Sequence, residues 1–120
     1  MMRNKEHQLQ KLIELKYQRA QALVTDAKTA CLKIDDQIAH LQERRNARPT
    51  DPSDQINHER HIGWLDHRNR ELTIMAAKAA ADYNIAKDML RLEFGRKTAW
   101  SKSVEKQTHE ISKRVSRQLS

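Results

Sequence analysis

Few side chains in this 120-residue sequence have the types and spacing that catalysis or metal binding requires. Asp35 and Asp36 are adjacent, and because neighbouring helix positions point in different directions, the two carboxylates cannot act as a paired acid and base. His58 and His61 are three residues apart, whereas the helical zinc-hydrolase motif needs histidines four apart and a third ligand. The sequence therefore predicts neither a carboxylate pair nor a metal site.

One thiol and two glycines complete the candidates for chemistry. Cys31 lies among Ala27 and Ile34 at helical spacing, so we expect a small buried apolar residue rather than a reactive thiol. A single cysteine cannot form an internal disulfide, which fits a reducing compartment. Gly63 and Gly95 are too far apart to form a phosphate-binding loop. We predict a protein without enzyme activity or cofactor.

The composition favours long helices. Two glycines, two prolines and 4% aromatic residues are too few for a β-sandwich or barrel, and 32% of the residues are charged. No apolar run approaches the roughly 18 residues that a membrane span requires, and the charged first residues lack the apolar block of a secretory signal. We expect an all-α, cytoplasmic protein.

The apolar residues from about 5 to 46 follow the spacing of one helix packed in a coiled coil. The segment 47–52 holds both prolines of the chain and predicts a turn. Asp51 or Ser53 can cap a second helix over about 53–118. Five apolar positions of the first helix recur every seven residues: Ile13, Ala20, Ala27, Ile34 and Leu41.

The second helix carries its own apolar stripe, so a short turn predicts an antiparallel hairpin that spans residues 1–120 as a single domain. Folding about residue 50 pairs positions whose numbers sum to roughly 100, such as Ile38 with Ile62 and Tyr17 with Tyr83. The longer second helix then overhangs the first, and its end has no partner within the chain. The stripe is formed by Ile62, Leu65, Leu72, Ala76, Ala79, Tyr83, Ala86, Leu90, Phe94, Trp100, Val104, Ile111 and Val115.

The charge distribution points to the open end of this hairpin. The net charge is +7, and residues 96–120 contain seven basic and two acidic residues. A net positive charge indicates an acidic partner surface, nucleic acid or an anionic membrane, and an unpaired apolar stripe usually marks a binding surface. Trp64 lies off the stripe near the turn, where it either contacts a partner or packs locally.

The sequence resembles the FliJ family of flagellar export proteins and its YscO-type counterparts in injectisome type III secretion. The resemblance rests on small residues, an acidic pair and a Gln followed by apolar residues in the first helix, and on Ala-Trp and Lys-Gln pairs in the second. The residues concerned are Leu9-x-x-Leu12-x-x-Leu15, Ala30-Cys31-x-x-x-Asp35-Asp36-Gln37-Ile38-x-x-Leu41, Ile62-x-x-Leu65, Ala99-Trp100 and Lys106-Gln107.

The resemblance implies a central stalk, peripheral to the inner-membrane export apparatus. Its open end would insert into the hexameric export ATPase, its closed end would contact the membrane protein of the export gate, and export chaperones are further candidate partners. On this chain the ATPase contact would involve Arg96, Lys97, Trp100, Lys102, Val104, Lys106, Ile111, Lys113 and Arg114. The export-gate contact would involve Gln37, Leu41, Arg44, His61, Trp64 and Leu65.

Two other functions remain open. A structural coiled coil that dimerises through its overhang needs only the unpaired apolar stripe. A hairpin that binds nucleic acid would use the basic excess. Against nucleic acid, acidic residues are interleaved along the chain, and no basic cluster alternates with aromatic residues.

Overall fold

The computed structural model describes residues 3–47 and 51–119 as two α-helices, with no strand in those ranges. α1 spans Asn4–Asn46 and α2 spans Pro52–Leu119, 43 and 68 residues respectively. Both lie within one residue of the helices expected from the sequence, and the all-α prediction is confirmed. Of the predicted turn, residues 48–50 lie outside the described residues.

The start of α2 is fixed by a local cap. The Oδ1 atom of Asp51 accepts a hydrogen bond from the backbone N–H of Ser53 at 3.1 Å and from its hydroxyl at 3.2 Å. Pro52 takes the first helical position, where a missing N–H costs nothing. Of the two candidates, Asp51 and Ser53, Asp51 is therefore the residue that caps α2. Gly63 and Gly95 do not interrupt the helix that follows.

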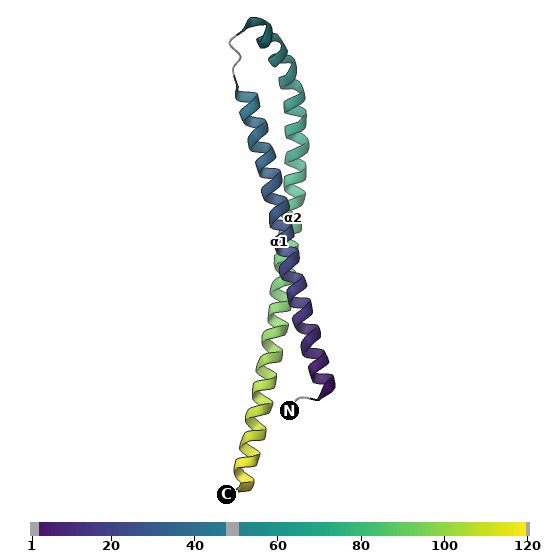
Figure 1. Cartoon of the computed structure of the whole chain (residues 1–120), viewed down its shortest axis with the longest axis vertical. Helices are drawn as coiled ribbons and strands as arrows, with labels where there is room; N and C mark the ends of the chain where they lie inside the picture. The colour runs from purple at the N-terminus through teal and green to yellow at the C-terminus, as the bar shows by residue number, and fades with distance from the viewer. Residues whose placement is uncertain (1–2, 48–50, 120) are drawn as a thin grey trace. The chain divides into compact units, whose positions relative to one another are not determined.

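The chain divides into two units, each made of one segment of α1 and one of α2. The turn unit comprises Val24–Ile85, and the terminal unit comprises the residues up to Leu23 and from Ala86 onward. In each unit the two segments run antiparallel (Figure 1). Along each segment, the buried and half-buried residues are separated alternately by three and four positions, which is the heptad pattern of a coiled coil. We call these buried and half-buried positions the seam. On α1 the seam is Ile13, Tyr17, Ala20, Val24, Ala27, Cys31, Ile34, Ile38 and Leu41.

The seam of α2 has the same period but includes polar residues that the apolar pattern did not reveal. Asn69 lies on it in the turn unit, and Glu93 and Lys97 lie on it in the terminal unit. Phe94, which the sequence placed on the stripe, is instead 55% exposed beside the seam. The seam of α2 is Leu65, Asn69, Leu72, Ala76, Ala79, Tyr83, Ala86, Leu90, Glu93, Lys97, Trp100 and Val104.

The predicted pairing register is wrong. In the turn unit Arg45 bonds to Asp66, and in the terminal unit Glu14 bonds to Lys97 and Tyr17 lies against Phe94. The residue numbers of each pair add up to 111 rather than roughly 100. The prediction assumed that the helices pair directly from the turn, whereas the first turns of α2 extend past the end of α1 (Figure 1). The observed register also brings the large side chains of Leu41, Leu65 and Leu72 into one cluster.

A cysteine cross-link checks this register. Cys31 and Ala79 are both seam residues of the turn unit, and in the observed register they face each other. We expect Ala79→Cys to form a disulfide with Cys31 within one molecule under mild oxidation, seen as a non-reducing gel shift of the monomer. The predicted register instead places Ala20 beside Ala79, so cysteines there in a Cys31→Ala background are the matched control. A cross-link in the control and none with Cys31 would contradict the observed register.

The core is concentrated in the turn unit. Leu65 and Leu72 are 0% and 1% exposed there, and Leu41 and Ile38 pack with them. The buried residues of the terminal unit are Ala20 and Ala86, which have little apolar surface. The large side chains that are fully buried therefore lie in the turn unit.

Candidate protein-binding surfaces

A shallow groove of about 250 Å³ lies on the turn unit, close to the end of α1. Its floor is formed by the core residues Leu41 and Leu72, and its walls carry amide, imidazole, guanidinium and indole groups. The groove combines apolar surface with cationic side chains, which suits a partner segment carrying apolar and acidic residues. The wall residues are Gln37, His40, Arg44, Trp64 and Arg68.

Three side chains form a connected group at this groove. Arg44 donates a hydrogen bond to Nε2 of His61 at 3.1 Å, and the His61 ring stacks on Trp64 with centroids 5.3 Å apart. Trp64 is nevertheless 52% exposed. Trp64 therefore presents a ring that is held in place on one side and accessible on the other, as residues at protein interfaces commonly are.

The structure thus gathers the six residues predicted for the closed end of the hairpin into one region of the turn unit. Gln37, Arg44 and Trp64 are exposed and line the groove. Leu65 has no exposed surface, so it supports the groove from the core. His40 and Arg68 also line the groove but were not predicted, because nothing in the sequence sets them apart from other exposed helix residues.

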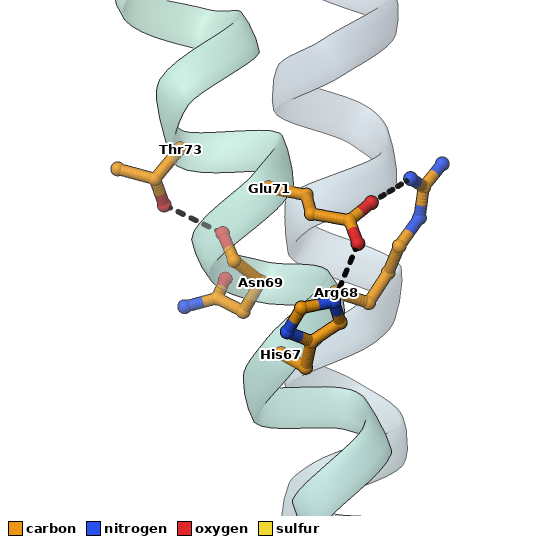
Figure 2. Close-up of polar contacts among 5 residues, drawn as sticks. All are labelled: His67, Arg68, Asn69, Glu71 and Thr73. Carbon is orange, nitrogen blue, oxygen red and sulfur yellow. Dashed lines mark hydrogen bonds and ion pairs between the residues drawn. The ribbon is translucent and has the colours of Figure 1, made fainter.

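Arg68 belongs to a set of contacts along the surface of α2 (Figure 2). The carboxylate of Glu71 binds His67 at 2.8 Å through Oε1 and Arg68 at 2.9 Å through Oε2. All three side chains come from neighbouring turns of one helix, so these ion pairs add a few tenths of a kcal/mol to helix stability at most. They also orient the Arg68 guanidinium beside the groove.

The seam of the terminal unit is polar at its centre. Nζ of Lys97 binds Glu14 at 3.1 Å and lies 4.5 Å from the centroid of the Tyr17 ring. One helical turn before Lys97, Glu93 binds Arg96 at 2.9 Å, and the side chain of Glu93 is only 15% exposed. Two of the predicted ATPase-binding cations, Arg96 and Lys97, are therefore already paired within the chain.

Trp100 and Val104 differ from the prediction. Both were expected to lack an intramolecular partner, but both are half-buried seam residues. The observed register places the first turns of α1 level with them, which explains their cover. The indole N–H of Trp100 is buried without a hydrogen-bond acceptor among the described residues, a cost that weakens this end of the seam.

The overhang of α2 is consequently shorter than predicted. Every residue of 105–119 is exposed, and this segment holds Lys106, Ile111, Lys113 and Arg114 of the predicted ATPase contact. Lys102, just before it, is exposed as well. We call 105–119 the free segment of α2, since in this register all of it after residue 107 extends beyond Asn4, the first residue of α1.

Basic and apolar residues occupy opposite faces of this part of α2. Residues two positions apart on a helix are rotated by about 200°, so Lys102 and Lys106 lie opposite Val104, and Lys113 lies opposite Ile111. Apart from Arg114, the basic residues of this part follow steps of three and four along one line of the helix. The basic stripe is Lys102, Lys106, His109, Lys113 and Arg117, and the apolar stripe is Val104, Ile111 and Val115.

Two further findings concern the described residues as a whole. Within 3–47 and 51–119 no three His, Cys, Asp or Glu side chains are grouped so that they could hold a metal ion. Neither α1 nor α2, over its described length, contains a stretch apolar enough to cross a membrane.

In comparisons with family models, curated proteins and solved structures, none matches this chain.

Proposed function

We propose that this protein is a central stalk of a type III protein export apparatus, flagellar or injectisome, which binds the hexameric export ATPase through the free segment of α2 and contacts the export gate near the turn. In this role it has no catalytic group of its own. It acts in the cytoplasm, at the periphery of the inner-membrane apparatus. The sequence resemblance suggests the system, and the surfaces of the two units supply the physical argument.

The observation that carries the proposal is the placement of two different stripes on opposite faces of α2. A flat partner can contact only one of these faces at a time. A partner that encloses the helix, as the interior of a hexameric ring does, can contact the basic stripe and the apolar stripe together. An acidic lining would attract the basic stripe of Lys102, Lys106 and Lys113, and apolar side chains would pack against Ile111.

The groove near the turn fits the second contact of a stalk. Trp64 supplies an exposed aromatic surface, and Arg44 and Arg68 supply cations beside it. Because this groove and the free segment belong to different units, substitutions in one can be made without altering the packing of the other. Export chaperones remain additional candidate partners of either surface.

The exposed apolar stripe also supports a second function, a coiled coil that dimerises through the free segment. Ile111 is 59% exposed, and pairing two copies would cover it. Repulsion between the basic stripes of two copies would oppose dimerisation only weakly, because each stripe lies on the face of α2 that points away from the dimer contact. Sedimentation equilibrium tests this second function, since a protein that dimerises through the free segment sediments at twice its chain mass of 14.1 kDa.

Stimulation of the export ATPase is the direct test of the stalk. A helix in an asymmetric ring stabilises the assembled hexamer and biases its subunits through differential contacts, so we expect faster ATP hydrolysis when this protein is added to its cognate ATPase. The rate of phosphate release is measured against protein concentration. An unchanged rate at saturating protein, with binding confirmed by co-sedimentation, would refute the mechanism.

A further inference from the structure

The terminal unit has an apolar face that neither the seam nor the free segment explains. On α1 it contains Leu12 and Leu23, and on α2 it contains Met89 and Leu92, which are between 46% and 55% exposed. Each of these residues directly precedes a seam residue in the sequence. We call these four residues the leucine face.

The contacts across the seam show that the four residues share one side of the unit. Glu14 and Phe94 directly follow seam residues, and both make contacts to the facing helix, Glu14 to Lys97 and Phe94 to Tyr17. In an antiparallel pair the following residues of both helices therefore lie along one edge of the seam. The preceding residues of both helices must then lie along the other edge, because they are rotated about 100° in the opposite direction from each seam residue.

Every charged residue that directly precedes a seam residue on this edge is basic, and one of them, Arg96, is paired with the seam residue Glu93. The positions that directly precede seam residues on this edge also include Lys16, Arg19 and Arg96. Within residues 12–23 and 89–103, none of the residues that directly precede a seam residue is Asp or Glu. Lys16 and Arg19 form no ion pair with any residue that the structure describes. The opposite edge is polar apart from Phe94, whose ring lies against Tyr17. Only one edge of the unit thus combines exposed leucines with unpaired cations.

We propose that the leucine face is a docking site for an amphipathic helix of a partner protein that carries leucine-like residues on one side and acidic residues beside them. A third helix in the groove beside two packed helices extends the coiled coil, with its apolar residues against Leu12, Leu23 and Leu92. Its carboxylates lie within reach of Lys16 and Arg19, which fixes its orientation. A second copy of this chain fits poorly, because its leucine face would bring the same cations together. The site does not depend on the proposed stalk function.

Designed peptides test the site on the intact protein. The probe is a fluorescein-labelled peptide of three heptads with leucine at the core positions and glutamate at the flanking positions, and its counterpart has lysine in place of glutamate. Fluorescence anisotropy should show binding of the glutamate peptide and none of the lysine peptide. Leu12→Ser with Leu92→Ser should weaken binding by about tenfold or more, as the loss of an interface anchor does. Leu32→Ser, at a residue that is 58% exposed on the other unit, is the matched control and should change nothing.

Charge reversal makes the test selective. Lys16→Glu with Arg19→Glu should abolish binding of the glutamate peptide and create binding of the lysine peptide, while Lys28→Glu with Lys33→Glu, which changes the net charge equally, should do neither. Circular dichroism confirms that each variant keeps its helix content. The proposal is overturned if both peptides bind equally, if the reversal leaves the preference unchanged, or if the protein dimerises and Leu12→Ser with Leu92→Ser abolishes the dimer.

Discussion

Replacing Leu72 with alanine should destabilise the protein by about 2 to 5 kcal/mol, the range for deleting a buried leucine side chain. Leu72 is 1% exposed and packs with Leu41 and Leu65 in the only cluster of large buried side chains that the described residues contain. The neighbouring seam residues Ala76 and Ala79 are too small to fill the resulting cavity. The total free energy of unfolding of a small domain is about 5 to 15 kcal/mol, so the loss is a large share of it.

Urea unfolding followed by circular dichroism measures this effect. Leu32→Ala is the matched control, because the same side chain is removed from a position that is 58% exposed in the same unit. Its free energy of unfolding should change by no more than about 0.5 kcal/mol, as at most surface sites. Equal destabilisation by the two substitutions would mean that the cluster around Leu72 does not hold the turn unit together.

The helices themselves could be predicted from the sequence because their signals are local. The seven-residue recurrence from Ile13 to Leu41 and the breakers before Pro52 depend only on neighbouring residues. The cap at Asp51 is a local signal of the same kind. These features placed both helices within one residue of their observed ends.

The register could not be predicted in the same way, because it depends on which of several apolar pairings buries most surface. A register with residue numbers summing to roughly 100 also pairs apolar residues throughout, for example Ile34 with Leu65. The observed register additionally pairs Arg45 with Asp66 and Glu14 with Lys97. Since the apolar period is seven residues on both helices, the apolar pattern alone repeats at each heptad and cannot distinguish neighbouring registers.

The candidate sites show the same division. Trp64 could be singled out because a tryptophan off the seam is unusual, and the structure places it exposed on the groove. The half-burial of Trp100 depends on how far α1 extends along α2. Because the predicted register was wrong, Trp100 was wrongly expected to have no partner within the chain. The leucine face was hidden for another reason. Its residues precede seam residues on two helices, and only the observed pairing brings the two sets to one side.

Under the proposed stalk function, reversing two charges on the basic stripe should slow association with the export ATPase by more than about tenfold at low salt. Lys106 and Lys113 are both exposed and lie on the same line of the helix as Lys102. Long-range attraction between a basic segment and an acidic surface accelerates encounter by about 10 to 1,000-fold, and salt screens it. Lys106→Glu with Lys113→Glu should therefore lower the association rate measured by stopped-flow fluorescence, and the difference from the wild type should shrink as salt increases.

The effect must depend on position and not only on net charge. Lys28→Glu with Lys33→Glu removes the same charge from exposed positions of α1 in the turn unit, and its association rate should fall by less than about threefold, as expected for a weak change in the overall field. Ile111→Ser, on the opposite face of the free segment, should raise the dissociation rate instead, because buried apolar contacts act mainly after encounter. If both charge-reversed variants slow association equally, the ATPase is attracted by the whole protein, and the basic stripe is not its contact. If Ile111→Ser leaves dissociation unchanged while the stripe variant slows association, the ATPase contacts one face of α2 and does not enclose the helix.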